Sequence, residues 1–410
     1  MATWLSYAGY YFCRKTFSVA KSTLQRDLHL DTTALAHVWT AFLVAYMLGQ
    51  FLSGELGARR GPRVLLLAGM AVSLGCNVAF GFANGFGTFL GFMVLNGVAQ
   101  ATGWPGNVAA MAPWFGRRER GTVMGLWSTC YQLGSVAAKA FAAFLLGWVG
   151  WRWSFWGASL VLGAVWLVFL VLQRNRPEDV GLAALDDERP IVVVPGDAAK
   201  RGRAASGFFG ILFNRTVLVM GVAYFCFKFL RYAVDSWLPY FLDAVYHLPA
   251  SRAGYASTVF DLMGFGGSLC AGYFSDRLFA GRRAAVMVLM SVGMTVAYLL
   301  LFRLGGAGIP VLITLYGLIG FFLFGPDTLL AGAGAIDVGS RRDAAAAAGI
   351  INGLGSIGPI FQEQLVARVY QSSGGSLTGV NSMMLGVSAA GTLALAFLWW
   401  RGRGDAARAV

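Results

Sequence analysis

The stretch SFWGASLVLGAVWLVFLVLQ at positions 154–173 decides the fold of this chain. It carries no charged residue, and similar stretches stand at 64–83 (VLLLAGMAVSLGCNVAFGFA) and 284–303 (AAVMVLMSVGMTVAYLLLFR). A helix needs roughly 20 apolar residues to cross a hydrocarbon core of about 30 Å. Lipid offers backbone polar groups no partner, so a spanning segment must be helical or part of a closed barrel. The sequence therefore predicts membrane-spanning helices.

The composition supports the same conclusion. The 410 residues are 57% hydrophobic and 12% charged, and the mean hydropathy is +0.63. Ordinary soluble domains are roughly 45–50% apolar and about 25% charged. The apolar runs lack the alternation of barrel strands. We expect an all-α polytopic membrane protein with 12 transmembrane helices at 1–24, 33–55, 62–82, 86–110, 121–147, 152–173, 213–242, 252–274, 283–303, 309–333, 344–370 and 379–400.

The net charge of +13 follows the topology of the chain. Arginines gather in alternate gaps between the apolar runs, whereas Arg152 and Arg252 are the main basic residues of the other gaps. Positive loops stay in the cytoplasm. The pattern predicts a multi-pass protein of the cell (inner) membrane with both termini cytoplasmic, and it argues against nucleic acid as a partner. The clustered residues are Arg59, Arg60, Arg63, Arg117, Arg118, Arg120, Arg277, Arg282, Arg283, Arg341 and Arg342.

Two kinds of chemistry find no support in the sequence. The five cysteines form no CxxC or Cys/His cluster, so no disulfide framework, metal site or other cofactor is expected. The three histidines lie near span ends, and no GxxxxGK[ST] phosphate loop is present. We therefore expect neither an enzyme nor ATP-driven work, and the energy has to come from a gradient or from exchange.

The chain is organised as two similar halves. Residues 174–208 hold no apolar run of helix length and read as a cytoplasmic linker between halves at 1–173 and 209–400, with a cytoplasmic tail at 401–410. GELGAR at 54–59 and GYFSDR at 272–277 are separated by nearly the same number of residues as Arg14 and Arg231. A parallel duplication of this kind is typical of transporters. The alternative is a single domain with one long loop.

Cations inside two spans mark the candidate site. CRKTF at 13–17 holds Arg14 and Lys15, and FCFKFLRYAVDSW at 225–237 holds Lys228, Arg231 and Asp235. Such charges are costly in lipid and usually face a cavity. Arginine binds phosphate or carboxylate with paired hydrogen bonds, and lysine adds a point charge. We expect a compact anion such as phosphate. Two alternatives remain: the cations extend to an interface, or Arg231 and Asp235 form a structural ion pair.

Further candidates accompany these cations. Tyrosine hydroxyls and an indole could contact phosphate or sugar hydroxyls, or simply pack, at Tyr7, Tyr11, Tyr46, Trp104 and Tyr131. Lys139 lies near the outer end of its span, where we expect its side chain to reach the interface. Asp261 could form a gate pair or bind a substrate hydroxyl; Glu363 and Asn352 are weaker candidates.

These motifs resemble those of the organophosphate:phosphate antiporter family of the major facilitator superfamily, over nearly the whole chain. YAGYYFCRKTF (7–17) is similar to its first-span motif, LRYAVDSWLPYFL (230–242) to the seventh-span counterpart, GWPGN (103–107) to its GWP motif and RGTVMGLWSTCYQLGS (120–135) to its signature. RPEDVGL, FDLMGFGG and AIDVGS followed by AAGIINGLGSIG look closest to the eukaryotic-type exchangers. The resemblance implies a major facilitator fold, phosphate binding by Arg14 and Arg231, and a cytoplasmic gate that includes Arg59, Asp276 and Arg277.

The chain departs from the family pattern at several positions. Tyr131 replaces the histidine of the signature, Gln50 replaces a lysine of the bacterial glycerol-3-phosphate transporters, and Ala58 stands where the second half has Asp276. Lys228 matches the eukaryotic-type members. These differences concern the organic part of the substrate and the symmetry of the gate.

The resemblance implies a monomeric secondary transporter that exchanges glycerol 3-phosphate or a sugar phosphate for inorganic phosphate by alternating access. One alternative is a membrane sensor of sugar phosphates. Another is a proton-coupled carrier of a different organic anion, with Asp261 or Glu363 carrying the proton. Arg14 lies so close to Met1 that we also expect translation to start upstream.

Overall fold

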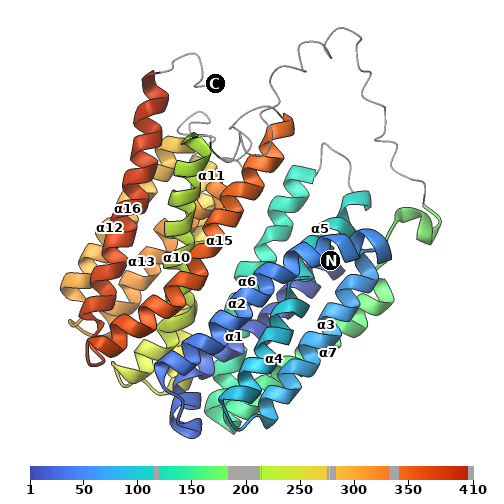
Figure 1. The fold of residues 1–410 in the computed structure, drawn as a ribbon, viewed down its shortest axis with the longest axis horizontal. Helices are drawn as coiled ribbons and strands as arrows, with labels where there is room; N and C mark the ends of the chain where they lie inside the picture. The colour runs from blue at the N-terminus through green and yellow to red at the C-terminus, as the bar shows by residue number, and fades with distance from the viewer. Residues whose placement is uncertain are drawn as a thin grey trace. The chain divides into compact units, whose positions relative to one another are not determined.

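The computed structural model is helical throughout the part of the chain that it describes (Figure 1). It describes residues 1–114, 120–182, 213, 215–274, 277, 283–331 and 341–404; within these ranges it describes side chains except at 51, 52, 54, 55, 57–59, 112, 120–122, 124, 125, 128, 283, 331, 341–350 and 401–404. The helices are α1 (Ala2–Leu28), α2 (Thr32–Arg60), α3 (Pro62–Phe82), α4 (Phe86–Gln100), α5 (Gly103–Met111), α6 (Arg120–Val149), α7 (Trp151–Leu172), α10 (Arg215–Ala244), α11 (Ala250–Tyr273), α12 (Arg283–Leu304), α13 (Ile309–Ala331), α15 (Arg341–Ser372) and α16 (Leu377–Gly404), with short 3-10 turns at Ala112–Trp114 and Pro177–Val180.

The predicted fold class is confirmed. Only Ala101 and Thr102 separate α4 from α5, so these two helices form one span and the described chain has 12 spans. Their bounds lie within a few residues of the predicted ones. The interruption inside the predicted span 86–110 is new. Pro105 in the first turn of α5 lacks the N–H that a continuous helix would need from it, although a first turn tolerates proline.

Eight of the described helices are long and apolar enough to cross a membrane by length and composition alone. The spans outside that group are α1, α4 with α5, α11 and α15. Several of them carry polar residues that the sequence singled out, such as Arg14 in α1, Asp261 in α11 and Asn352 in α15. The polar residues of these spans are therefore candidates for a functional site, as are Lys228 and Arg231 in α10.

Burial is distributed as lipid requires. Large apolar side chains are exposed, for example Trp148, Leu160 and Leu393, whereas Lys139 and Gln100 are completely buried. Burying a leucine side chain gives little free energy when the solvent is lipid, because lipid is itself apolar. A charged side chain is more stable when it faces the protein interior and a partner. The buried polar and charged side chains are therefore the groups that could bind an anion.

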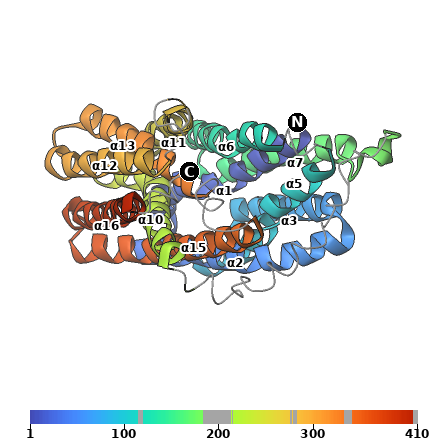
Figure 2. The ribbon, with the colours of Figure 1, turned by 90° about the horizontal axis from the view of Figure 1, so that it is seen from above.

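The residue contacts divide the chain into two compact units. Unit 1 comprises Met1–Arg189 and Asp235–Asp261, and unit 2 comprises Pro190–Val234 and Leu262–Val410. In unit 1, α1 packs against α6 and α7, α2 packs against α4, and α3 packs against α7. In unit 2, α12 packs against α13 and α16, and Figure 2 shows α12 beside α13.

The segment Asp235–Asp261 takes the second part of α10 and the first part of α11 into unit 1. The predicted division at 1–173, 174–208 and 209–400 stays a prediction. Most of the predicted linker, from residue 183 to 208, lies outside the described residues, and α16 continues to Gly404.

Candidate functional site

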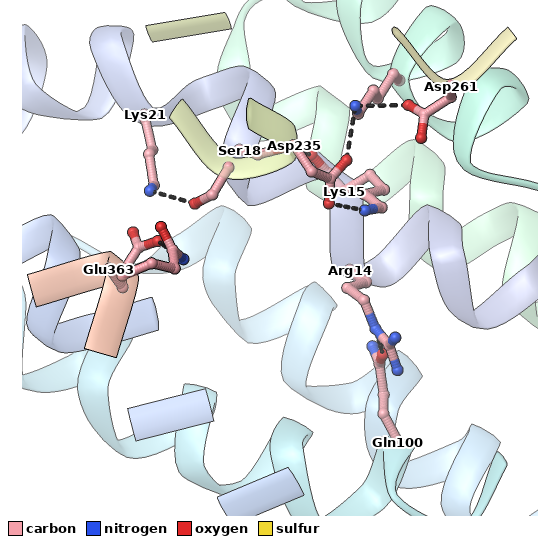
Figure 3. A network of polar contacts seen from close by, with 11 residues as sticks. Arg14, Lys15, Ser18, Lys21, Gln100, Asp235, Asp261 and Glu363 are labelled. Carbon is pink, nitrogen blue, oxygen red and sulfur yellow. Dashed lines mark hydrogen bonds and ion pairs between the residues drawn. The ribbon is translucent and has the colours of Figure 1, made fainter. Parts of the chain in front are cut away.

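Arg14 lies in the middle of α1 and is held by neighbours within unit 1. Its Nε donates a hydrogen bond of 2.9 Å to Oε1 of Gln100 on α4, as Figure 3 shows. Its guanidinium lies 4.8 Å from the ring centre of Tyr46 and 5.1 Å from that of Tyr11. Only 7% of the residue is exposed. A neutral amide and two aromatic faces hold and orient this cation.

Gln100 is itself fixed by hydrogen bonds. Its amide nitrogen donates to Ser73 on α3 and to Asn96 one turn earlier on α4. The Ser73 hydroxyl also donates to Asn96. All three residues are completely buried. These hydrogen bonds hold the amide nitrogen of Gln100, so Gln100 presents its oxygen to Arg14 in one direction.

The predicted aromatic residues contact Arg14 or one another in unit 1. The Tyr7 ring centre lies 5.8 Å from that of Tyr11 and 5.6 Å from that of Trp104, at the start of α5. Trp104 is 39% exposed, whereas Tyr7 and Tyr11 are buried. Tyr131 packs against the same buried cluster. The structure therefore places Tyr11 and Tyr46 against Arg14, Tyr7 against Tyr11, and Trp104 against Tyr7.

Lys15 belongs to a buried chain of alternating charges in unit 1. Its ammonium binds the carboxylate of Asp235. The other oxygen of Asp235 lies 2.7 Å from the ammonium of Lys139 on α6, and Lys139 lies 2.7 Å from Asp261 on α11. Figure 3 shows Lys15 directed at Asp235. Two lysines and two aspartates neutralise one another in a buried chain, which is the arrangement that a low-dielectric interior tolerates.

The prediction for Lys139 is wrong. Its side chain does not reach an interface, because it is completely buried between the carboxylates of Asp235 and Asp261. Asp261 is thus a partner of Lys139, in keeping with the ion-pair option. Asp235, which was considered as a partner of Arg231, binds Lys15 and Lys139.

One buried cation of α1, Lys21, was missed by sequence reasoning. Lys21 is completely buried, donates a hydrogen bond of 2.6 Å to Ser236 and lies 3.9 Å from the ring centre of Trp237. Lys21 follows Arg14 by two helical turns, so the two cations lie on the same side of α1. The spacing between Arg14 and Lys21 in the sequence could have indicated that Lys21 faces the same side of the helix as the predicted site.

Unit 2 contains the second predicted pair of cations. Arg231 Nη1 donates to Asp327 Oδ2 on α13 at 2.8 Å, and the guanidinium lies 4.7 Å from the ring centre of Phe324. Lys228 donates to Asn352 Oδ1 at 2.8 Å and to Ser356 Oγ at 3.1 Å, both on α15. The predicted residues Lys228 and Asn352 are therefore in direct contact. Asp327 was not predicted.

The predicted gate is described only in part. Arg277 is exposed, and its guanidinium lies 5.9 Å from the ring centre of Tyr273 at the end of α11. Asp276 and the side chain of Arg59 lie outside the described residues. Within the residues that the structure describes, no three His, Cys, Asp or Glu side chains form a group that could hold a metal ion. The chemistry that the described site offers is anion binding by arginine and lysine.

Known proteins similar to this chain share its fold over almost its full length. A family model described as Major Facilitator Superfamily matches residues 3–363. A solved structure of a bacterial homologue of the human lysosomal transporter Spinster, inward-facing and unoccupied, aligns with a TM-score of 0.76 and 16% identity, over 98% of this chain and 96% of that chain. At this identity the likeness concerns the fold alone.

Three relatives have similar sequences. The "Probable hexose phosphate transport protein" of Chlamydia pneumoniae is 28% identical, over 89% of this chain and 83% of its own length. The "Glycerol-3-phosphate transporter" of Bacillus subtilis (strain 168) is 29% identical, over 97% of this chain and 91% of its own length. The "Membrane sensor protein UhpC" of Escherichia coli (strain K12) is 27% identical, over 90% of this chain and 84% of its own length. The chain belongs to the major facilitator superfamily and, within it, to the organophosphate:phosphate antiporter family.

Proposed function

We propose that the protein is a secondary transporter that exchanges a phosphate ester for inorganic phosphate across the inner membrane. One observation carries the proposal: each unit holds a largely buried arginine with a lysine on the same helix. Arg14 and Lys15 lie in α1 of unit 1, and Lys228 and Arg231 lie in α10 of unit 2. Arginine can donate two parallel hydrogen bonds to the oxygens of a phosphate group, and a nearby ammonium adds positive charge.

The substrate class is proposed from the relatives. Their names refer to hexose phosphate and glycerol 3-phosphate, which share a phosphate monoester and differ in the organic part. Arg14 and Arg231 would bind the shared phosphate, with Lys15 and Lys228 in support. Tyr7, Tyr11, Tyr46, Trp104, Tyr131 and Asn352 would face the organic part, which fits the presence of hydroxyl, amide and ring groups around the cations.

Obligatory exchange requires that the carrier changes state only with a ligand bound. A transporter switches between its two states only if the ligand favours the path between them. A phosphate group bound by both arginines would favour the closed state, whereas an empty carrier would lack that contribution. We therefore propose obligatory exchange, with phosphate or its ester bound in each direction, and with Arg59, Asp276 and Arg277 at a cytoplasmic gate.

The test is a counterflow assay with the purified chain in liposomes. Labelled external phosphate should accumulate when the lumen holds phosphate, and little should enter when the lumen holds only phosphate-free buffer. A panel of phosphate monoesters added outside should then compete according to the organic group. Equal uptake with and without internal phosphate would contradict exchange.

A second candidate function is sensing, because one similar protein is named a membrane sensor. The same arginines would bind a phosphate ester, but the chain would not complete a transport cycle. Calorimetry and counterflow on the same preparation separate the two functions. Binding of a phosphate ester without any counterflow would favour the sensor.

A further inference from the structure

Arg231 and Asp327 form a buried ion pair inside unit 2. Nη1 of Arg231 lies 2.8 Å from Oδ2 of Asp327, and 3% of the Asp327 side chain is exposed. The other oxygen, Oδ1, is buried and accepts no hydrogen bond from any residue that the structure describes. A carboxylate thus lies on the guanidinium to which the proposed function assigns the phosphate group.

The surroundings of Asp327 offer little else to a negative charge. Asp327 follows Pro326 inside α13, and neighbouring Gly325 lies against Met290 of α12 and Ala271 of α11. The cations that face Asp327 come from α10, where Lys228 also lies within electrostatic reach. The groups that α11 and α15 bring to this region, Ser268 beside Thr328 and Asn352 with Ser356 at Lys228, are uncharged.

Phosphate and the Asp327 carboxylate are competitors for Arg231. A dianionic phosphate on the guanidinium would place its oxygens within a few ångströms of an ionised carboxylate, and like charges at that distance do not both stay ionised. The carboxylate has no water to receive it, because the residue is 2% exposed. A buried carboxylate without its cation is strongly unfavourable, so neutralising it by a proton is the remaining route.

We propose that Asp327 takes up one proton when a phosphate group binds at Arg231, so that substrate binding is linked to protonation of this carboxylate. The inference rests on the proposed function. The balance is simple: the carboxylate of Asp327 and one proton, drawn from water or from a monoanionic phosphate, give the neutral acid. The acid O–H can then donate to a phosphate oxygen, while Arg231 pairs with the phosphate.

The proton then travels with the phosphate group. In an exchange, each inward phosphate carries one proton in and each outward phosphate carries one out, so exchange moves no net proton. This role differs from the proton carriers considered from the sequence. Asp261, for example, is bound to Lys139 in unit 1.

Proton linkage is measured directly by calorimetry. Inorganic phosphate is titrated into the purified full-length chain at about pH 8, in two buffers of different ionisation enthalpy; the difference in heat gives the protons taken up per ligand. We expect about one proton per phosphate for the unaltered protein. Asp327→Asn keeps the shape and an acceptor for Arg231 but holds no exchangeable charge, and its proton uptake should fall to near zero.

Affinity gives a second readout. Because one proton is linked to binding, the affinity of the unaltered protein should fall about tenfold for each rise of one pH unit over the range in which one proton is taken up. The affinity of Asp327→Asn should be nearly independent of pH and at least equal to that of the unaltered protein at high pH. The matched control is Asp243→Asn, which removes the carboxylate of the ion pair with Arg26 at 3.0 Å and should keep the proton uptake.

The outcomes separate the inference from the proposed function. Phosphate binding by the unaltered protein without proton uptake would overturn the inference and leave the proposed function intact. The same proton uptake in Asp327→Asn as in the unaltered protein would also overturn it. If Asp327→Asn does not fold, the measurement on the unaltered protein still decides. A folded protein that binds neither phosphate nor its esters would overturn both.

Discussion

The ammonium nitrogen of Lys139 lies 2.7 Å from a carboxylate oxygen of Asp235, so a buried ion pair joins α6 to α10 inside unit 1. The second carboxylate on Lys139, from Asp261, joins α6 to α11. These contacts attach the segment Asp235–Asp261, which follows the linker in sequence, to the first six spans. Besides their place near the candidate site, these charges stabilise the packing of unit 1.

Lys139→Met should therefore destabilise the protein. The change removes the cation that contacts the buried carboxylate of Asp261 and leaves Asp235 paired with Lys15, and breaking such a pair costs about 3–5 kcal/mol. The double variant Lys139→Met with Asp261→Asn removes one charge of each sign and should recover a large part of the loss. Thermal unfolding in detergent measures both changes.

The control for this prediction is Arg26→Met. Arg26 pairs with Asp243 at 3.0 Å, but 56% of its side chain is exposed, and such pairs contribute at most about 1 kcal/mol. Equal losses in Arg26→Met and Lys139→Met would contradict the account of the buried charges.

Gln100 should matter for phosphate affinity through Arg14. Gln100→Leu removes an acceptor worth about 1.5–3 kcal/mol to a charged donor, so the KM for phosphate should rise roughly tenfold as Arg14 loses its orientation. Gln100→Glu should raise KM further, because a carboxylate would neutralise Arg14 and compete with phosphate. Counterflow at varied phosphate concentration gives both values.

The order of these two variants is the informative result. Gln173→Leu, at the end of α7 and bonded to the backbone of Arg174, is the control and should leave KM unchanged. A lower KM in Gln100→Glu than in Gln100→Leu would show that Gln100 does not orient a phosphate-binding arginine.

Asn352 should support Lys228. Asn352→Leu removes the oxygen that accepts a hydrogen bond from the ammonium at 2.8 Å, a loss of about 0.5–1.5 kcal/mol or somewhat more for a charged donor. We expect KM for phosphate to rise several-fold, and Ser356→Ala, which removes the longer bond of 3.1 Å, to have a smaller effect. Larger effects from Ser356→Ala would contradict this order.

Gly97 sets the approach of α2 to α4. A Cβ added there would lie 2.6 Å from the Phe42 carbonyl oxygen and 2.9 Å from the Cβ of Ala45, both in α2. Gly97→Ala should lower the thermal stability by about 1–3 kcal/mol, because the two helices have to separate. Gly91 on the same helix has nothing within 4 Å of an added Cβ, so Gly91→Ala is the matched control and should have little effect.

The spans could be predicted from the sequence because lipid imposes a length and a composition on each of them. The two cation pairs were found for the same reason, since an ionised residue in an apolar run stands out. That rule, applied to every span, would also have singled out Lys21 in α1 and Asp327 in FFLFGPDTLLA at 321–331.

The partners of those charges could not be predicted. Lys139 is 122 residues from Asp261, and no local pattern says which of several buried charges will meet after folding. Its position near the end of a span favoured the interface, but two carboxylates from distant helices stabilise it inside. In the same way, Arg231 finds Asp327 on α13, which is 96 residues away.

The most direct test of the central claim is phosphate counterflow by Arg14→Ala and Arg231→Ala, with Arg26→Ala as the control. These three variants and the unaltered chain are reconstituted in phosphate-loaded liposomes, and labelled phosphate is added outside. The account predicts exchange by the unaltered chain and by Arg26→Ala, and none by either of the other two variants. Exchange at the unaltered rate in a folded Arg14→Ala or Arg231→Ala protein would contradict the claim that these two arginines bind the phosphate group.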